Sequence, residues 1–495
     1  MSSDDPEIVI VGAGLAGICA AINLLKHGFR DFVIVEKGAG VGGTWRYNTY
    51  PGSACDVVSL MYSFSFAPGR DWESMYAQQP EILSYIEKVF DDYGLGAFTC
   101  FNTEVLSYTF DDDTDRWRVE TVDGRVLRPR AVIAGIGALH QPHVPSFPGM
   151  ADFQGETCHS MHWDPGTDVR GKRIAVIGAG ASAVQIVPAV AEEAKQVYVV
   201  QRTPQWVLPK PDRKINRFER FLFRALPASQ KLYRAFAYWS HELAIVLFMH
   251  PKLLKVLEGA SLRTLRQQVP DPELRSRLTP EYTIGCKRIL LTSDYYPALA
   301  RDNVELVDSP VKGFERQGIR TGDGQLHEVD IIVYATGFAT DNRLANERIT
   351  GRDGLSIQEA WRDGMHAHLG TTIPKFPNFF LMMGPNSGGG SQSILFVIEA
   401  QAHYIAQCLR MMRDTGASRL EVRADVERDF NKWLHAKLAK SVWNSGGCDS
   451  WFLDRSGHNR QAWPGSSVDY WRRTRRPRRD WFHLDGPGRA REVLR

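Results

Sequence analysis

The sequence predicts an α/β protein with two doubly wound domains and a helical insert. Residues 7–36 have the pattern of a strand, a glycine-rich turn, an alanine-rich helix and a second strand, and residues 173–202 repeat that order. Between residues 209 and 280, apolar residues recur at helical spacing without a strand pattern. The repeated unit predicts two dinucleotide-binding domains, and the stretch without strands predicts the insert.

The first glycine-rich turn has the residues that suit a dinucleotide with a free ribose diol. Gly12, Gly14 and Gly17 follow the apolar run Ile8–Val11, and Glu36 ends the next apolar run, roughly 20 residues further on. Glycine permits the tight turn and lets backbone N–H groups approach a pyrophosphate at a helix N-terminus. Because a carboxylate accepts hydrogen bonds from a ribose diol and repels a phosphate, this turn predicts FAD or NAD.

The second turn differs in the sign of the charge that follows it. Gly178 and Gly180 follow an apolar run, and Ser182 lies in the first turn of the expected helix. Arg202 stands where the first unit has its glutamate. A guanidinium at this position pairs bidentately with a 2′-phosphate, so the second turn predicts NADPH.

The rest of the chain divides around these two turns. We expect residues 1–150 to form the first part of an FAD-binding domain, and residues 336–495 to form its second part and a C-terminal loop. Residues 151–208 and 281–335 are expected to form the two parts of an NADPH-binding domain. Residues 209–280 predict the helical insert, which we interpret as a substrate lid.

Composition excludes several classes of protein. The chain has 495 residues, is 43% hydrophobic and has a net charge of +3, so it can bury two or more cores and shows no charge footprint for nucleic acid. The one dense basic run is the six arginines between residues 472 and 479. A solvated face and a contact with anionic lipid are both open interpretations of that run.

The seven cysteines are scattered, odd in number and never spaced C-x-x-C. This usage predicts reduced thiols in a cytoplasmic compartment, without structural disulfides and without a metal site. Residues 1–5 lack the basic start of a signal peptide, and the longest strongly apolar stretch, residues 243–249, is too short to span a bilayer. We therefore expect a cytoplasmic protein.

Two further motifs carry a resemblance to a known family. Phe153, Gly155, His159, Trp163 and Asp164 stand in the order F-x-G-x-x-x-H-x-x-x-W-D, and Gly43-Thr44-Trp45 precedes a Tyr-Pro-Gly turn. Together with the two glycine-rich turns, these motifs resemble the type I Baeyer–Villiger monooxygenases, which are class B flavoprotein monooxygenases. The resemblance extends from the N-terminus to about residue 340 and is weaker after it.

The resemblance implies roles for individual residues. Arg288 matches the arginine that lies over the flavin, and Asp56 matches its aspartate partner. Lys287 is similar to the lysine that helps Arg202 hold the 2′-phosphate. Trp451, in Ser-Trp-Phe, resembles the tryptophan of a mobile loop that covers the nicotinamide. Gly43, Thr44 and Trp45 would contact FAD.

The family implies the reaction as well. NADPH would reduce FAD, the reduced flavin would bind O₂ as a C4a-peroxyflavin, and one oxygen atom would enter beside the carbonyl of a small hydrophobic ketone to give an ester or lactone. Many members also oxidise sulfides. An N- or S-oxygenating flavin-containing monooxygenase is the alternative enzyme, and a flavoprotein that only senses redox state is the alternative outside catalysis.

Structural interpretations compete with these roles. Asp56 could cap a helix after the Pro-Gly turn, and the neighbours Lys287 and Arg288 could be a solvated pair. His159 and Trp163 lie four apart, which is typical of core packing on a helix, and we expect them to position the hinge between the domains.

The insert carries an apolar stripe with basic neighbours. Its members fall three or four residues apart and are Leu232, Phe236, Trp239 and Leu243. We expect this stripe to pack over the active site as a substrate lid, with peripheral contact with a membrane as the alternative.

Overall fold

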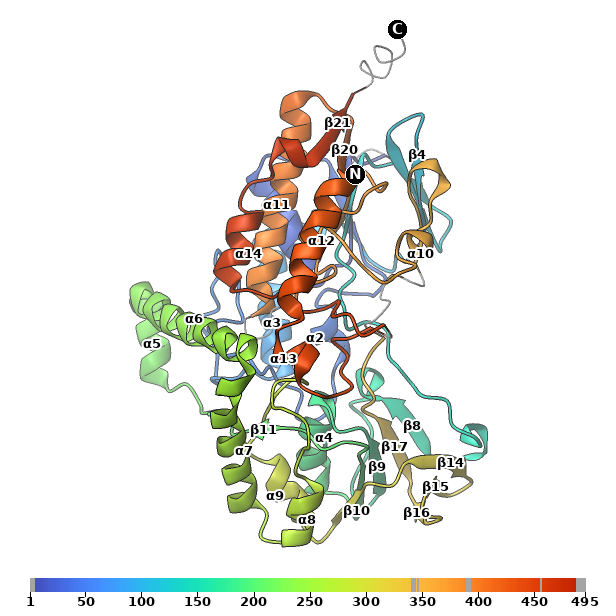
Figure 1. The fold of residues 1–495 in the computed structure, drawn as a ribbon, viewed down its shortest axis with the longest axis vertical. Coiled ribbons are helices and arrows are strands. Elements are labelled where there is room, and N and C mark those ends of the chain that lie inside the picture. The colour runs from blue at the N-terminus through green and yellow to red at the C-terminus, as the bar shows by residue number, and fades with distance from the viewer. Residues whose placement is uncertain (1–4, 340–343, 345–346, 389–392, 455, 487–495) are drawn as a thin grey trace.

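Two parallel five-stranded sheets, one in each half of the molecule, organise the fold (Figure 1). The computed structural model describes residues 5–339, 344, 347–388, 393–454 and 456–486. Both sheets follow the same plan, in which a central strand ends in a glycine-rich turn that leads into a helix. This is the doubly wound arrangement that the sequence predicts.

The first sheet has the strand order β19-β7-β1-β2-β3 and is parallel throughout. Its strands are β1 (Ile8–Val11), β2 (Phe32–Val35), β3 (Thr99–Cys100), β7 (Ala131–Ala134) and β19 (Phe379–Leu381). Because successive side chains of a strand point to opposite faces, Ile8 and Ile10 pack with α1 (Leu15–Lys26) and α11 (Ile394–Thr415). The edge strand β19 brings the region after residue 336 back to this sheet.

The opposite face of the first sheet is covered by a four-stranded sheet with the order β18-β4-β5-β6. Its strands are β4 (Val105–Asp111), β5 (Arg116–Thr121), β6 (Val126–Leu127) and β18 (Arg348–Thr350). Val9 and Val11 of the parallel sheet share a core with Tyr108 and Trp117 of this one. The Trp117 indole N–H donates to the Pro377 carbonyl at 2.8 Å, so the buried ring leaves no unpaired donor.

The second parallel sheet has the order β13-β10-β9-β17-β8. Its strands are β8 (Glu156–His159), β9 (Arg173–Ile177), β10 (Gln196–Val200), β13 (Val304–Val307) and β17 (Ile331–Tyr334). One face packs on α4 (Ala181–Ala191) and α9 (Tyr295–Leu299). The other face is covered by an antiparallel sheet of β14 (Val311–Glu315), β15 (Gly318–Thr321) and β16 (Leu326–Glu328).

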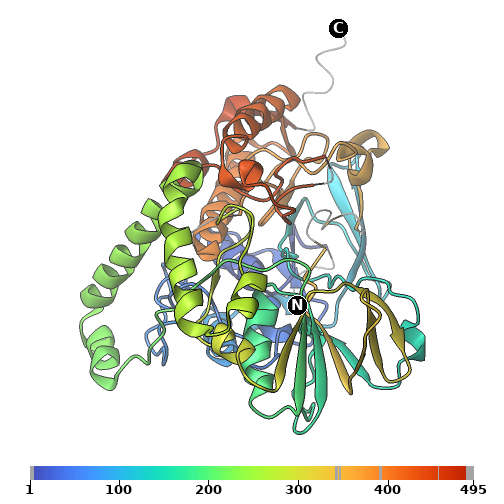
Figure 2. The same cartoon turned by 60° about the horizontal axis from the view of Figure 1, so that its bottom comes forward.

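The insert is helical, as predicted. It contains α5 (Arg217–Ala225), α6 (Pro227–Met249), α7 (Lys255–Gln268) and α8 (Pro272–Arg277). Its ends are joined where β11 (Val207–Leu208) pairs with β12 (Leu290–Leu291). Both views show α5 and α6 as a hairpin that reaches beyond the rest of the molecule (Figures 1 and 2). Among the described residues no helix is both long and apolar enough to cross a bilayer.

The predicted packing of the insert's apolar stripe is wrong. Leu232, Phe236, Trp239 and Leu243 each expose between 61% and 74% of their surface to solvent, so the stripe is not packed against the protein. The helix turns a different face to the protein, and that face includes the buried polar residues Gln230 and Glu242. The role of the insert as a substrate lid stays a prediction.

The remaining helices and strands surround the first sheet. They are α2 (Thr44–Tyr47), α3 (Gln79–Asp92), α10 (Ile357–Ala360), α12 (Ala424–Leu438), α13 (Val442–Ser445), α14 (Ser467–Thr474), β20 (Arg419–Val422) and β21 (Phe482–Asp485). The two strands pair antiparallel near the C-terminal end of the chain.

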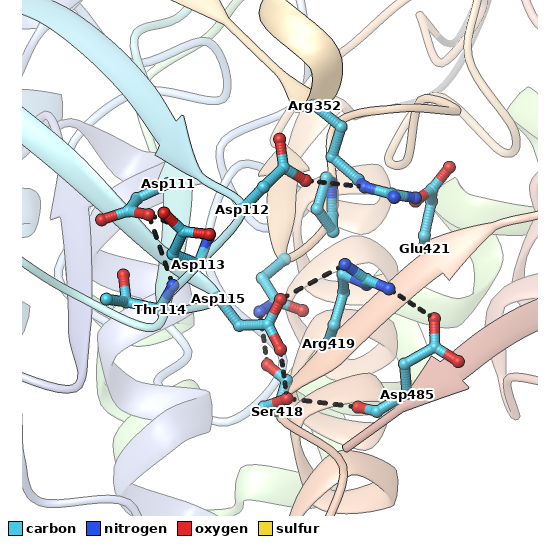
Figure 3. Close-up of polar contacts among 12 residues, drawn as sticks. Asp111, Asp112, Asp113, Thr114, Asp115, Arg352, Ser418, Arg419, Glu421 and Asp485 are labelled. Carbon is cyan, nitrogen blue, oxygen red and sulfur yellow. Dashed lines mark hydrogen bonds and ion pairs between the residues drawn. The ribbon is translucent and has the colours of Figure 1, made fainter. Parts of the chain in front are cut away.

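Two partly buried arginines tie β20 to the turn between β4 and β5 (Figure 3). Arg419 lies between Asp115, at 3.3 Å, and Asp485, at 2.8 Å. Arg352 lies between Asp112, at 3.0 Å, and Glu421, at 2.9 Å. The contacts with Asp112 and Asp115 join residues that are 240 and 304 positions apart in the sequence. They therefore stabilise the return of the C-terminal region to the first domain.

We expect Arg419→Met to lower the stability of the folded protein by about 1–3 kcal/mol, because it leaves two carboxylates without their shared cation. Arg170→Met is the matched control, since Arg170 is exposed and pairs with one aspartate, and it should change stability by less than about 0.5 kcal/mol. Urea unfolding of the FAD-loaded protein measures both. Equal effects of the two substitutions would contradict the role of the network.

Candidate active site

The first glycine-rich turn has no space for side chains. Gly12 adopts a φ of +95°, and a Cβ there would lie 2.8 Å from the carbonyl oxygen of Gly135 at the end of β7. A Cβ on Gly17 would overlap the Gly12 carbonyl, so the helix packs directly on the strand end. Gly14 is the N-cap of α1 and no side chain caps it. The first N–H groups of α1 are thus open to an anionic ligand.

Glu36 lies at the carboxyl end of β2 and is buried. Its carboxylate accepts hydrogen bonds from the backbone N–H groups of Ala13, at 2.7 Å, and Gly38, at 2.8 Å. These bonds fix the carboxylate beside the glycine turn with acceptor capacity left over. The position is the one expected for an acceptor of a ribose diol.

The Gly43-Thr44-Trp45 motif lies against the first turn. A Cβ on Gly14 would be 3.6 Å from the Cα of Gly43, so the two backbones face each other. Thr44 begins the short helix α2. The Trp45 indole N–H donates to the hydroxyl of Tyr62 at 2.8 Å. Because Tyr62 is buried, this hydrogen bond orients the Trp45 ring.

The second glycine-rich turn repeats the geometry of the first. Gly178 has a φ of +125°, and a Cβ there would overlap the carbonyl oxygen of Ala335 at the end of β17. Gly180 is the uncapped N-cap of α4, and a Cβ at this position would meet no atom within 4 Å. Ser182 follows in the first turn and lies close to the Tyr50 hydroxyl. The start of α4 is therefore open to a pyrophosphate as well.

Arg202 and Lys287 come together near the end of β10. Arg202 is exposed, and Lys287 is half-buried with its ammonium 5.1 Å from the centre of the Tyr282 ring. Burial lowers the pKa of Lys287, the charge of Arg202 lowers it further, and Asp449 acts in the opposite direction. Two mutually repelling cations at one place suit a ligand with a doubly charged phosphate.

Asp56 and Arg288 form an ion pair between the two domains. An Arg288 Nη lies 3.1 Å from one carboxylate oxygen of Asp56, and the Lys210 ammonium lies 3.7 Å from the other. The Asp56 side chain is 10% exposed and that of Arg288 is 51% exposed. Asp56 therefore does not cap a helix, and Arg288 presents a fixed charge to an accessible space.

A disulfide between Cys286 and Cys448 corrects the prediction of reduced thiols. The two cysteines are 162 residues apart, so no short spacing motif marks them. The bond fixes the C-terminal loop beside Lys287. Cysteine usage consequently no longer supports the cytoplasmic assignment, which stays a prediction.

Trp451 follows this disulfide in the same loop. Its ring stacks on Phe452, with centroids 4.4 Å apart, and Phe452 is buried against Trp443. Trp451 itself is about half exposed. The disulfide places the loop that contains Trp451 near Lys287. The contact of Trp451 with nicotinamide stays a prediction.

His159 and Trp163 are buried but do not lie on one helix. His159 ends β8, and one turn of 3-10 helix (Ser160–His162) separates it from Trp163. A His159 ring nitrogen lies 2.9 Å from the Gly337 carbonyl, and burial lowers the pKa of this histidine. The Trp163 carbonyl accepts from the Thr49 hydroxyl at 2.9 Å. These contacts join the two domains at their crossover, which agrees with the expected positioning role.

Sequence reasoning missed several residues that hold the site together. Gln185 accepts from the Tyr50 hydroxyl at 2.9 Å and donates to the Ala54 carbonyl at 3.0 Å. Lys210 contacts Asp56, and Asp449 lies near Lys287. None of these has a motif of its own. Only their proximity in space to motif residues reveals them.

Comparison with known proteins agrees with this geometry. The family described as pyridine nucleotide-disulphide oxidoreductase matches residues 9–220. A Baeyer–Villiger monooxygenase of Pseudomonas aeruginosa is 42% identical over 480 residues, covering 97% of this chain and 91% of that protein. The chain belongs to the Baeyer–Villiger monooxygenase family.

Solved structures of similar monooxygenases share the fold. Cyclohexanone monooxygenase from Rhodococcus sp. Phi1 bound to NADP⁺ superposes with a TM-score of 0.88 at 27% identity, covering 97% of this chain and 99% of that one. The enzyme OTEMO in complex with FAD and NADP gives 0.86 at 27% identity, covering 95% and 97%. The fold class predicted for this member of the Baeyer–Villiger family is thereby confirmed.

We expect Arg202→Ala to raise the Michaelis constant for NADPH about 10- to 100-fold and to leave that for NADH almost unchanged, because one charge-assisted contact with the 2′-phosphate is lost. Arg170→Ala, an exposed arginine of the same domain, is the control. Steady-state NADPH and NADH oxidation measures the ratio. Equal losses with both nucleotides would contradict the assignment.

Lys287 should make NADP⁺ binding depend on pH. Its pKa is lowered in the free protein, and a bound phosphate would raise it again. Affinity should therefore fall as the pH rises above the free-protein pKa, because the lysine must then take up a proton on binding. Calorimetric titration should show this fall in the native chain and not in Lys287→Met. The same dependence of affinity on pH in both proteins would show that Lys287 does not contact the 2′-phosphate.

Loss of the disulfide should loosen the C-terminal loop. We expect Cys448→Ser, or reduction of the native protein, to speed amide hydrogen exchange at residues 446–454 at least about tenfold, because the loop loses its covalent tie to Cys286. Cys100→Ser, at a partly buried free cysteine, should leave the loop unchanged. If Cys286 and Cys448 both react with an alkylating agent in the unreduced protein, the disulfide does not form.

Proposed function

We propose that this chain uses NADPH and O₂ to insert one oxygen atom beside the carbonyl of a small hydrophobic ketone, giving an ester or lactone. The observation that carries the proposal is the Asp56–Arg288 ion pair, which joins the halves of the chain that carry the two dinucleotide turns. An enzyme that only transfers hydride does not require a fixed cation at this junction. One that handles an oxygen anion does.

The described residues fit both cofactors. At Gly12 and Gly178 only a residue without a Cβ lets the backbone pack on the neighbouring strand end, and the helices that follow begin at Gly14 and Gly180 without a side-chain cap. Glu36 offers a buried carboxylate to a ribose diol, whereas Arg202 and Lys287 offer two cations to a 2′-phosphate. FAD, when bound and reduced by NADPH, supplies the activation of O₂.

We assign these cofactors to the two halves of the chain. Residues 1–150 and 336–495 would hold FAD, with Gly14, Gly17, Gly43, Thr44 and Trp45 near its phosphates and ring. Residues 151–208 and 281–335 would hold NADPH, with Gly180 and Ser182 at its pyrophosphate. Support comes from β19, which returns to the first sheet, and from β13 and β17, which return to the second.

Arg288 would provide the charge that favours the reaction at a carbonyl. A guanidinium stays protonated at all physiological pH values, so it places a permanent positive charge beside the negative oxygen that develops on the ketone. Asp56 is largely buried and hydrogen-bonded to Arg288, so it orients the guanidinium and moderates its charge. Trp451 would close the nicotinamide side of the site against water.

The fixed cation favours nucleophilic attack on a ketone over oxygenation of an amine. An amine or sulfide is oxidised by an electrophilic, protonated oxygen, which a neighbouring guanidinium disfavours. Sulfides remain a secondary class of substrate in the proposal. Purified holoenzyme should be incubated with NADPH and separate panels of ketones, sulfides and amines, with products identified by mass spectrometry. N-oxide formation without any ester would refute the proposal.

We expect Arg288→Ala to bind FAD normally and to lower ester formation at least about 100-fold, because a preorganised cation at the developing anion is removed. NADPH oxidation should continue with release of hydrogen peroxide. Arg213→Ala, at an exposed arginine paired with Glu219, should retain coupled turnover. Product yield per NADPH oxidised measures the difference, and normal coupling in Arg288→Ala would remove Arg288 from the mechanism.

A further inference from the structure

The helix α6 is oriented with an apolar stripe toward solvent. Leu232, Phe236, Trp239 and Leu243 recur every three or four residues on one face, and 61–74% of each is exposed. Soluble helices usually bury such a stripe. Val246 continues the same face and is exposed as well. An exposed stripe of this size marks an interaction surface.

Polar contacts fix the opposite face of α6 to the protein. Gln230 donates to the Gly69 carbonyl, and Arg234 donates to the Ser63 hydroxyl at 3.2 Å. The Glu242 carboxylate is buried and accepts from the Ser467 backbone N–H at 2.9 Å. Because these specific contacts satisfy buried polar groups, the helix cannot roll its exposed stripe inward without leaving them unpaired.

The apolar surface continues along the hairpin and past α6. Phe218 and Phe221 of α5 are exposed, as is Leu226 in the connection. Leu253 and Val256, after the end of α6, are exposed too. We call the exposed apolar residues between 218 and 256 the hairpin surface. The hairpin projects from the body of the protein in both views, so a flat partner can reach it (Figures 1 and 2).

The charge around the hairpin surface is positive even after its ion pairs are counted: Arg220 and Arg224 pair with Glu73 and Asp71, whereas Arg217 and three lysines make no ion pair among the described residues. Residues 217–256 contain seven lysines and arginines and two glutamates. Both glutamates are engaged within the protein, Glu219 with Arg213 and Glu242 with Ser467. Lys231, Lys252 and Lys255 are exposed beside the apolar side chains. A partner with an apolar interior and an anionic surface would match both the exposed apolar side chains and the positive charge of the hairpin surface.

A second basic segment adjoins α6. The Glu242–Ser467 contact places the start of α14 against α6, and the arginine run at 472–479 begins within α14, about 8 Å further along the helix. Four of its members, Arg472, Arg475, Arg476 and Arg479, make no ion pair among the residues that the structure describes. The run therefore adds to the positive potential on this side of the molecule.

We propose that the hairpin surface docks on the surface of an anionic phospholipid bilayer. The aromatic and aliphatic side chains enter the boundary between headgroups and acyl chains, and the lysines and arginines contact lipid phosphates. The contact is interfacial, since no described helix can span the bilayer. It depends on the surface alone and holds whether or not the substrate is a ketone.

A second copy of the chain is a less suitable occupant. Two copies that pair through this face about a twofold axis would bring the unpaired lysines of both copies together, and like charges at close range repel. Lipid phosphates instead compensate that charge. The experiment must nevertheless distinguish the two occupants, because both would bury the same side chains.

Co-sedimentation of the full-length, FAD-loaded protein with lipid vesicles tests the proposal. Vesicles of phosphatidylcholine alone are compared with vesicles that also contain phosphatidylglycerol, at low and high salt. We expect binding to the anionic vesicles that weakens with salt. The double substitution Phe236→Ser and Trp239→Ser should lower the bound fraction at least about tenfold. Lys231→Glu with Lys255→Glu should weaken binding to anionic vesicles specifically.

Matched control substitutions distinguish vesicle binding through the hairpin surface from nonspecific binding of the protein to vesicles. Leu106→Ser with Val122→Ser removes two exposed apolar side chains from the β4–β5 sheet, and Lys172→Glu with Lys195→Glu reverses two exposed charges on the second domain. Both should bind vesicles like the native chain. NADPH oxidation in solution should be unchanged in all hairpin variants, which shows that they fold.

Three results would overturn the proposal. The first is native chain that stays in the supernatant with both kinds of vesicle at low salt. The second is equal binding by the hairpin variants and the controls. The third is a native protein that binds no vesicles and is a dimer by light scattering, while the Phe236→Ser, Trp239→Ser variant is a monomer. This last result would assign the surface to a second copy of the chain.

Discussion

The close approach of backbone to backbone at the two glycine-rich turns is the constraint on which both dinucleotide sites depend. At Gly12 the place of a Cβ is taken by the carbonyl oxygen of Gly135, which follows the neighbouring strand. At Gly178 the carbonyl oxygen of Ala335 has the same position. A side chain at either turn would separate two strand ends and move the helix N-terminus that they support. Because this holds twice, one chain can present two open helix N-termini of the same design.

The distance between the two sites is set by contacts that cross from one domain to the other. A Cβ on Gly52 would lie 2.5 Å from the carbonyl oxygen of Gln185, so the Tyr-Pro-Gly turn packs directly on α4 of the second domain. Asp56 follows that turn after a few residues and meets Arg288 from the segment before β12. The ion pair is therefore positioned by backbone packing beside it, and its partly exposed arginine need not supply much stability itself.

Sequence patterns predict those parts of the structure that depend on interactions between residues close together in the chain. The strands, the glycine turns and the charges at Glu36 and Arg202 follow from periodicity and residue type, and the structure contains the expected elements. The link between Cys286 and Cys448 was not predictable, because the two positions meet only through the packing of the C-terminal loop. The spacing of His159 and Trp163 is typical of one helix, whereas the strand pairing of β8 with β17 decides the conformation of His159. The side chains that shape the substrate pocket depend on the same kind of distant packing.

The stripe on α6 shows most clearly where periodicity reaches its limit. A helical period reveals that apolar side chains share a face, and it does not reveal whether that face is inside. Here Glu242 and Gln230 find hydrogen-bond partners within the protein, so the usual cost of burying polar groups is largely removed. Ala237, Ile245 and Phe248 are buried with them and supply apolar contact on the same side. The inward face of α6 is thus packed and hydrogen-bonded without the apolar stripe. The side chains of the stripe remain exposed and form a surface on which a partner outside the chain can dock.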